Sequence, residues 1–168
     1  MALSNPVPIA KEHQIDSFDC GVAPLNEYLR QYALANNQNR SSRTYVAMNG
    51  SRIAGYYTLS NGSVNHDEAP VRVVQGLGRY PIPIALLARL AVDQSEKGKG
   101  IGRGLLKDAV LRCYQASELV GSRAIVTHAK DEEAKSFYQR FQFAPSPMNE
   151  FHLYLLMKDV RSIFSECI

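Results

Sequence analysis

The sequence predicts a single α/β domain whose central mixed, twisted sheet of about six strands is flanked by helices. Three observations predict this fold. The chain of 168 residues is long enough for one domain with a substantial core. Apolar β-rich runs alternate with segments of helical periodicity. No low-complexity linker or internal repeat divides the chain, so one domain is expected over residues 1–168.

The individual elements follow from periodicity and turn signals. Helices are expected where apolar residues recur at i, i+3, i+4 and i+7, and strands where β-branched and aromatic residues cluster. Asn49-Gly50 is a strong hairpin signal, whereas residues 61–81 lack sustained periodicity and predict a loop with short helical turns. The predicted order is strand 6–9, helix 25–36, strands 44–48, 53–59 and 84–92, a helix beginning at the glycine turn 98–104, strand 124–127, a helix opened by Asp131 and Glu132, and strand 151–157.

Several classes of protein are excluded by composition. The longest apolar stretch, residues 82–88, is interrupted by Pro83, so we expect neither a membrane span nor a membrane partner. The N-terminus lacks the basic and apolar regions of a signal peptide, so a cytoplasmic protein is expected. Cys20, Cys113 and Cys167 are widely spaced and form no CxxC pair, so we expect no bound metal and idle thiols.

Positive charge is concentrated in the middle of the chain. The net charge is only +3, but residues 30–107 hold eleven Lys or Arg against four Asp or Glu, a local net charge of +7. Such an excess favours a polyanionic ligand, which could be a phosphorylated cofactor, a nucleic acid, or both. A solvated basic face without a partner is the alternative.

The segment from Gly98 to Gly104, preceded by Lys97, is a glycine-rich, basic turn between a strand and a helix. This arrangement is typical of an anion site, because the first N–H groups of a helix lack partners and glycine lets phosphate approach the backbone. The Walker A spacing is absent, and a Rossmann GxGxxG that starts at Gly98 would need glycine where Arg103 stands.

The pattern that fits the turn, Lys97-Gly-Lys-Gly-Ile-Gly102, resembles the [QR]xxGxG turn that cradles the pyrophosphate of coenzyme A in GCN5-related N-acetyltransferases (GNAT enzymes). Further motifs resemble the GNAT toxins of bacterial type II toxin–antitoxin systems, the TacT-like group, over about residues 16–157. These motifs are Phe18-Asp-Cys-Gly21, Leu25-Asn26, Gly55-Tyr-Tyr-Thr-Leu59, Ile82-Pro-Ile84, Leu87-Ala-Arg-Leu-Ala-Val-Asp93, Asp108-Ala-Val-Leu-Arg-Cys-Tyr114 and Glu133-Ala-Lys-Ser-Phe-Tyr138.

The resemblance implies a GNAT domain that uses acetyl-CoA to acetylate the α-amino group of the amino acid on charged tRNA and so blocks translation. It also implies a ribbon-helix-helix antitoxin and a homodimer. Two departures from the family pattern are Lys97, where glutamine or arginine is usual, and Thr127-His128-Ala129, where asparagine is frequent after the fifth strand. Lysine keeps the charge of arginine but not its planar fork.

The resemblance also implies roles for individual residues. Backbone N–H near Val92 polarises the acetyl carbonyl, and Tyr138 acts as the general acid on the departing thiolate. Read from periodicity alone, Tyr138 would be one more member of the apolar stripe of its helix. The expected acetyl-CoA contacts are Leu90, Val92, Lys97, Gly98, Lys99, Gly100, Ile101, Gly102 and Arg103.

No residue stands out as a general base. Glu132 and Glu133 suit the start of a helix, and His128 suits the end of a strand. Deprotonating a lysine amine at neutral pH costs roughly 4–5 kcal/mol, whereas an α-amino group costs only about 1–1.5 kcal/mol. A site without a strong base therefore favours an α-amine acceptor.

The expected contacts to tRNA phosphates are arginines, which give affinity but little sequence choice. They are Arg30, Arg40, Arg43, Arg79 and Arg89. Arg89 interrupts a buried strand, so it could instead be structural or line the acceptor channel. Three alternatives stay open: a GNAT enzyme for a small amine or a peptide N-terminus, a catalytically silent acetyl-CoA- or nucleic-acid-binding module, and, disfavoured by Arg103, a Rossmann oxidoreductase.

Overall fold

A computed structural model describes residues 3–164 and confirms the α/β class. Its strands are hydrogen-bonded in the order β1-β2-β3-β4-β5-β7-β6, a mixed sheet of seven strands rather than about six. The strands are β1 (Val7–Pro8), β2 (Arg43–Asn49), β3 (Arg52–Val64), β4 (Ile82–Val92), β5 (Ala124–His128), β6 (Ala144–Pro145) and β7 (His152–Leu156). The helices are α1 (Ala23–Gln31), α2 (Ala33–Asn39), α3 (Val71–Val74), α4 (Ile101–Ser117), α5 (Glu132–Gln139) and α6 (Val160–Ile163), with 3₁₀ turns η1 (Gln94–Glu96) and η2 (Met157–Asp159).

Contacts divide the chain into two compact units, each made of two segments. The first unit runs through Ser60 and resumes over Ala88–Ala109. The second comprises Asn61–Leu87 and the chain from Val110 onward. Strands β3 and β4 and helix α4 each begin in one unit and end in the other. That both units belong to one domain stays a prediction.

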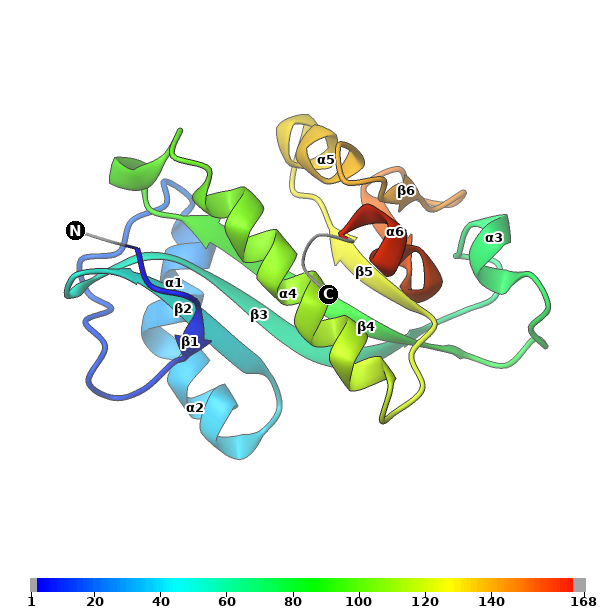
Figure 1. Cartoon of the computed structure of the whole chain (residues 1–168), viewed down its shortest axis with the longest axis horizontal. Coiled ribbons are helices and arrows are strands. Elements are labelled where there is room, and N and C mark those ends of the chain that lie inside the picture. The colour runs from blue at the N-terminus through cyan, green and yellow to red at the C-terminus, as the bar shows by residue number, and fades with distance from the viewer. Residues whose placement is uncertain (1–2, 165–168) are drawn as a thin grey trace. The chain divides into compact units, whose positions relative to one another are not determined.

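In the first unit, α1 and α2 lie beside the hairpin of β2 and β3 (Figure 1). A single helix over 25–36 was expected, but the backbone of Tyr32 leaves the helical range at φ −121° and separates α1 from α2. Leu29 and Ala33 on either side of the break are both fully buried. The apolar period therefore continues across the break, which explains why periodicity cannot reveal it.

The β2–β3 hairpin is confirmed. Asn49 pairs with Arg52 across a turn in which Gly50 takes a positive φ of 65°. The register shifts between Ala47 and Met48, which makes Ala54 the extra residue of a β-bulge. The carbonyl of Ala54 accepts the backbone N–H of Asp93 at 2.9 Å, so the bulge anchors the segment that follows β4.

Gly55 allows the elements of the first unit to approach closely. A Cβ atom there would lie 2.8 Å from Cδ1 of Leu105 and 2.9 Å from the carbonyl oxygen of Ala91. Both distances are shorter than Cβ atoms tolerate. Glycine at this position is therefore what lets β3 contact the backbone of β4 and the first turns of α4.

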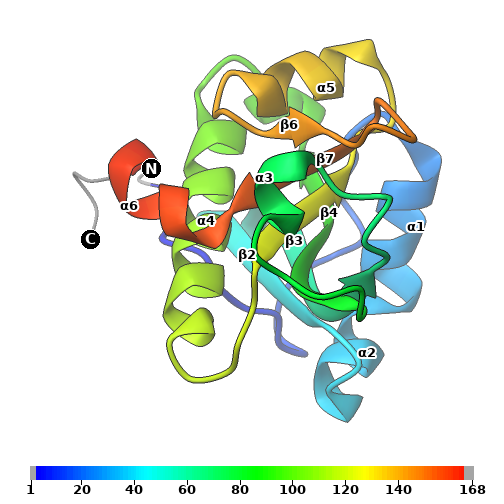
Figure 2. The same ribbon diagram turned by 90° about the vertical axis from the view of Figure 1, so that its right-hand side faces the viewer.

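In the second unit, β4 pairs in parallel with β5 from Ile84 to Leu87, as the strand–helix–strand pattern predicts. The β5–β7 and β6–β7 pairs are antiparallel. Figure 2 shows α3 beside β7, and Val73 of α3 is buried in the same cluster as Val126 and Tyr154. Strand β6 was not expected, because two residues that include a proline carry no periodicity.

Part of the loop expected over residues 61–81 has regular secondary structure. Strand β3 extends to Val64 and the four-residue helix α3 follows, in keeping with the expected short helical turns. Arg123 holds α3 in place, since its Nε donates to the carbonyl of Val73 at 2.8 Å. The helix expected to open at Asp131 and Glu132 is α5, and Asp131 is its N-cap, with Oδ1 accepting the N–H of Ala134 at 2.8 Å.

Candidate active site

Residues 97–100 of the glycine-rich segment form the turn between η1 and Ile101, the first residue of α4, whereas Gly102, Arg103 and Gly104 belong to the first turn of that helix. Gly98 and Gly100 take positive φ angles of 82° and 78°, which only glycine adopts without strain. A Cβ at either position would meet no described atom within 4 Å. The turn is thus an open stretch of backbone at the start of a long helix, the geometry that binds phosphate oxygens.

The three cations of the turn have different surroundings. Nζ of Lys99 lies 2.9 Å from Oε2 of Glu96, and Asn49 donates to Oε1 of the same buried carboxylate at 2.8 Å. The bonds from Lys99 and Asn49 lower the pKa of Glu96 below its usual value. Nζ of Lys97 donates to the carbonyl of Cys20 at 3.3 Å. Arg103 is exposed on the first turn of α4.

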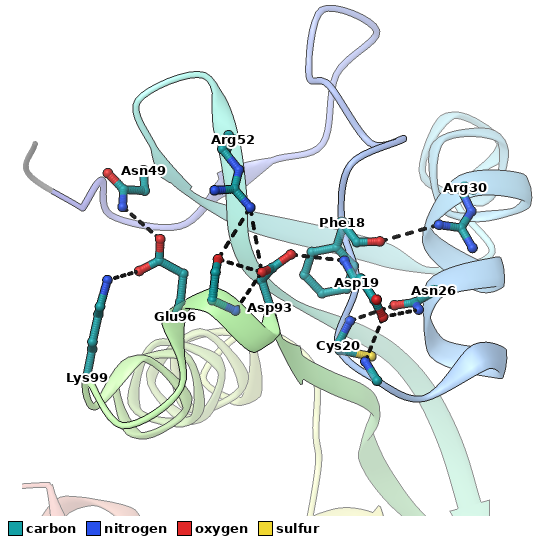
Figure 3. A network of polar contacts seen from close by, with 12 residues as sticks. Phe18, Asp19, Cys20, Asn26, Arg30, Asn49, Arg52, Asp93, Glu96 and Lys99 are labelled. Carbon is teal, nitrogen blue, oxygen red and sulfur yellow. Dashed lines mark hydrogen bonds and ion pairs between the residues drawn. The ribbon is translucent and has the colours of Figure 1, made fainter.

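Asp93, directly after β4, is the centre of a polar network that Figure 3 shows from close by. Its side chain is almost fully buried. Oδ1 accepts the N–H and the hydroxyl of Ser95 at 2.9 and 2.7 Å, and Arg52 lies 3.7 Å away. Oδ2 accepts the N–H of Asp19 at 2.9 Å. Burial opposes ionisation, but these hydrogen bonds and Arg52 lower the pKa of Asp93 overall.

Asp93 and Asp19 were not among the site residues expected from the sequence. Both stand in quoted motifs, but only as carriers of the family resemblance. The bond between them joins positions 74 residues apart. A local sequence pattern cannot predict a contact between residues so far apart in the chain. The sequence did show an aspartate at the end of a buried strand, just before a glycine turn, and that placement could have marked Asp93 as a site residue.

The expected carbonyl-polarising strand is β4. The parallel pairing of β4 with β5 ends at the pair Leu87–Thr127. Strand β4 continues for five more residues, to Val92. Leu90 and Val92, both expected cofactor contacts, are half-buried, and Ile101 is buried at the start of α4. That these residues contact the cofactor stays a prediction.

Tyr138 is on α5, in the second unit, with 6% of its surface exposed. Its ring contacts Phe137 and Phe143 at centroid distances of 5.2 and 5.5 Å. Burial raises the pKa of Tyr138 to about 12, against the opposing effect of hydrogen bonding by Thr127. The phenol is therefore neutral at physiological pH. Tyr138 belongs to the apolar stripe of its helix and also carries a proton that it could donate.

Thr127 and His128, expected from the family pattern to follow the fifth strand, are instead the last two residues of β5. Thr127 is buried, and its hydroxyl donates to the carbonyl of Leu87 at 2.9 Å. His128 ends β5, as expected, and stacks on His152 with ring centroids 3.8 Å apart. Burial and the neighbouring His152 lower the pKa of His128, so this ring is neutral at physiological pH.

The five arginines expected to contact tRNA differ in their surroundings. Arg40 is exposed and ends α2 in a left-handed conformation at φ 68°, and Arg79 is exposed in the loop after α3. Arg30, also exposed, donates to the carbonyl of Phe18 at 3.3 Å. Arg43 is half-buried and donates to the carbonyl of Asn37 at 3.1 Å. Arg89 is half-buried against the ring of Tyr28.

Residues 3–164 offer neither a membrane span nor a metal cluster. In that range no helix is long and apolar enough to span a bilayer. No group of three or more His, Cys, Asp or Glu is placed to hold a metal ion in the same part of the chain. Cys20 and Cys113 are buried free thiols, and burial raises the pKa of Cys113 to about 12. Cys167 lies outside the described residues.

Comparison with known proteins agrees with this geometry. Residues 40–145 match the acetyltransferase (GNAT) domain, and the chain belongs to this family of N-acetyltransferases. It is 44% identical to a tRNA-acetylating toxin of Mycobacterium tuberculosis (strain ATCC 25618 / H37Rv) over 97% of this chain and 98% of that protein.

Two solved structures of the AtaT toxin have the same fold. The first, AtaT complexed with acetyl-methionyl-tRNAfMet, is 26% identical with a TM-score of 0.89 and covers 97% of this chain and 99% of its own. The second is a tyrosine-to-phenylalanine mutant of AtaT bound to the C-terminus of the antitoxin AtaR and acetyl-CoA. It is 27% identical with a TM-score of 0.82 and covers 98% of this chain and 99% of its own.

Proposed function

We propose that this protein is an acetyl-CoA-dependent toxin that acetylates the α-amino group of the amino acid on charged tRNA and thereby blocks translation. The similarity to a tRNA-acetylating toxin over nearly the full length of both chains carries the proposal. The structure of AtaT with acetyl-methionyl-tRNAfMet supports it, since that product carries the acetyl group on a charged tRNA.

Acetyl-CoA is proposed to bind along β4 and the glycine turn. The open backbone at Gly98 and Gly100 and the start of α4 suit the pyrophosphate, and Lys97, Lys99 and Arg103 add positive charge. Because Lys99 is paired with Glu96, we expect Lys97 and Arg103 to contribute more of the charge. The strand residues Leu90 and Val92 are proposed to contact the part of the cofactor nearer the thioester.

The proposed reaction is an acyl transfer from sulfur to nitrogen. The neutral amine attacks the thioester carbonyl, whose developing negative charge is stabilised by backbone N–H near Val92. The C–S bond then breaks, the amine loses a proton, and the sulfur gains one. With a pKa of about 12, Tyr138 is a weaker acid than a thiol of pKa about 8.5. Tyr138 is therefore proposed to pass its proton as the C–S bond breaks and to be reprotonated by the proton that the amine loses.

The surroundings of the candidate bases favour an α-amine acceptor. His128 is stacked on His152, and its lowered pKa makes it a weak base. Glu132 and Glu133 are exposed in the first turn of α5. An α-ammonium group costs only about 1–1.5 kcal/mol to deprotonate at neutral pH, so water suffices to take this first proton and to leave the neutral amine that attacks.

The remaining assignments concern partners and location. We propose that Arg30, Arg40, Arg43, Arg79 and Arg89 hold tRNA phosphates or the acceptor end. We also propose that a ribbon-helix-helix antitoxin neutralises the protein, that it forms a homodimer, and that it acts in the cytoplasm. The AtaT structure with its antitoxin AtaR supports an antitoxin partner.

The test is transfer of labelled acetyl from acetyl-CoA to charged tRNA, with deacylated tRNA and free amines beside it. Label on charged tRNA alone is expected, with the rate lowered about 10²-fold or more in Tyr138→Phe. Phe137→Leu is the matched control, because it changes the neighbouring ring of α5 and leaves the hydroxyl in place. Label on free amines or peptides but not on charged tRNA would favour an ordinary GNAT enzyme.

A further inference from the structure

Residues 18–21 bridge two parts of the first unit. On one side this bridge is hydrogen-bonded to the segment that leads into the glycine turn. The N–H of Asp19 donates to Oδ2 of Asp93 at 2.9 Å, and the N–H of Gln94 donates to the carbonyl of Asp19 at 2.8 Å. Nζ of Lys97 donates to the carbonyl of Cys20 at 3.3 Å.

On the other side the 18–21 bridge is bonded to α1. Oδ1 of Asn26 accepts the N–H of Cys20 at 2.9 Å, and Nδ2 of Asn26 donates to Oδ1 of Asp19 at 2.9 Å. Arg30 reaches the carbonyl of Phe18 from the same helix. In Figure 3 the bridge lies between α1 and the segment that holds Asp93. It therefore links the candidate cofactor turn to a helix that carries a candidate tRNA contact.

The bridge has little freedom to move independently. Gly21 takes a positive φ of 84°, and a Cβ there would lie 2.3 Å from Nε2 of Gln94. The ring of Phe18 is 2% exposed and packs edge-on against Tyr56 at 5.5 Å. Because both ends are held by buried groups, a shift of the 93–97 segment must displace the bridge or break its hydrogen bonds.

We propose that Asp93 is a positioning residue whose bond to the 18–21 bridge couples the acetyl-CoA turn to helix α1, so that cofactor binding orders the part of the protein that meets charged tRNA. This inference rests on the proposed function for the identity of the second substrate. The coupling itself concerns only acetyl-CoA and the contacts of the first unit.

The two oxygens of Asp93 allow the coupling to be broken selectively. Oδ1 holds Ser95, whereas Oδ2 accepts from Asp19. In Asp93→Asn the remaining oxygen can still cap Ser95, but an amide NH₂ faces the N–H of Asp19, which leaves two donors opposed. Ser95→Ala is the matched control, because it removes one hydrogen bond to the same carboxylate and leaves the bridge intact.

The first experiment measures hydrogen exchange of residues 18–26 with and without coenzyme A. Coenzyme A should slow exchange in the wild type and in Ser95→Ala, and should slow it clearly less in Asp93→Asn, in which only the Gln94–Asp19 and Lys97–Cys20 bonds still join the two segments. Asn26→Asp keeps the acceptor for the N–H of Cys20 but replaces the donor to Oδ1 of Asp19 by a second carboxylate, so it weakens the α1 side. Protection should be kept at the bridge and reduced in α1. The proposal would be overturned if coenzyme A protected Asp93→Asn as strongly as the wild type. It would also be overturned if coenzyme A did not protect Ser95→Ala.

The second experiment measures steady-state acetylation of charged tRNA. Asp93→Asn should raise the KM for charged tRNA by about tenfold, since the loss of a buried hydrogen bond costs a factor of this order. Ser95→Ala should leave that KM within about twofold of wild type. If charged tRNA is not the acceptor, no variant will show acetylation, whereas the exchange experiment still decides the coupling. If Asp93→Asn acetylates charged tRNA with an unchanged KM, the proposed coupling is contradicted.

Discussion

The guanidinium carbon of Arg89 lies 3.6 Å from the centroid of the Tyr28 ring, so a cation of β4 is stacked on an aromatic side chain of α1. The hydroxyl of Tyr28 is hydrogen-bonded to Ser42 at 2.9 Å, and Asn36 donates to it at 3.3 Å. This arrangement explains how an arginine can interrupt an apolar strand. The charge is half-buried on an aromatic face that is itself held in place.

Replacing Arg89 by lysine should destabilise the protein although the charge is kept. The planar guanidinium stacks flat on the ring, whereas an ammonium keeps only part of the cation–π attraction, so we expect the free energy of unfolding to fall by about 0.5–1 kcal/mol. Urea denaturation measures this change. Tyr28→Leu should make the Arg89 substitution nearly silent, whereas Tyr28→Phe, which keeps the ring, should not. Equal effects of Arg89→Lys in all three backgrounds would exclude the stacking explanation.

Gly55→Ala should lower stability because the added methyl group has no space. Its Cβ would lie 2.8 Å from Leu105 and 2.9 Å from the carbonyl of Ala91. Overpacking of this kind costs about 1–3 kcal/mol. Gly104→Ala, in α4 with nothing within 4 Å, is the control and should stabilise the helix by about 0.5–1 kcal/mol. Thermal unfolding of both variants should show a lower melting temperature for Gly55→Ala and a higher one for Gly104→Ala. A Gly55→Ala protein as stable as the wild type would contradict the close packing around Gly55.

Arg40→Gly should separate stability from tRNA binding. Arg40 adopts a left-handed conformation at φ 68°, which costs an L-residue about 1 kcal/mol relative to glycine. The variant should therefore be slightly more stable, yet should bind charged tRNA more weakly because one phosphate contact is lost. The slope of log affinity against log salt concentration should become shallower by about 0.7–0.9. A more stable variant with an unchanged salt slope would remove Arg40 from the tRNA contacts.

The Asp93 network should make stability depend on acid pH. The folded-state pKa of Asp93 is lowered from its ordinary value of 3.8, against burial, by hydrogen bonds from Asp19 and Ser95 and by Arg52. A lowered carboxylate pKa contributes stability that is present above the unfolded value and is lost as the pH falls through the folded one. Denaturant midpoints measured from neutral pH to below 3.8 should fall less steeply for Asp93→Asn than for the wild type. Parallel curves would contradict the role of this carboxylate.

Periodicity predicted most of the fold because each element buries a regular stripe. The β2–β3 hairpin, β4 and α5 all lie where apolar pattern and turn residues agree. Strand β6 was missed because a strand of two residues is too short to show a periodic pattern. The break at Tyr32 was missed because the buried apolar stripe continues across it. The glycine turn could be predicted because its chemistry is local, whereas the Asp93–Asp19 bond depends on the folded arrangement of two distant segments.

The most direct test of the proposed function identifies the atom that receives the acetyl group. Charged tRNA incubated with the protein and acetyl-CoA is digested with nuclease, and the 3′-terminal aminoacyl-adenosine is analysed by mass spectrometry. The proposed function predicts one acetyl group on the α-nitrogen of the esterified amino acid, greatly reduced with Tyr138→Phe. An unmodified aminoacyl-adenosine, or an acetyl group on the ribose or the base, would contradict it.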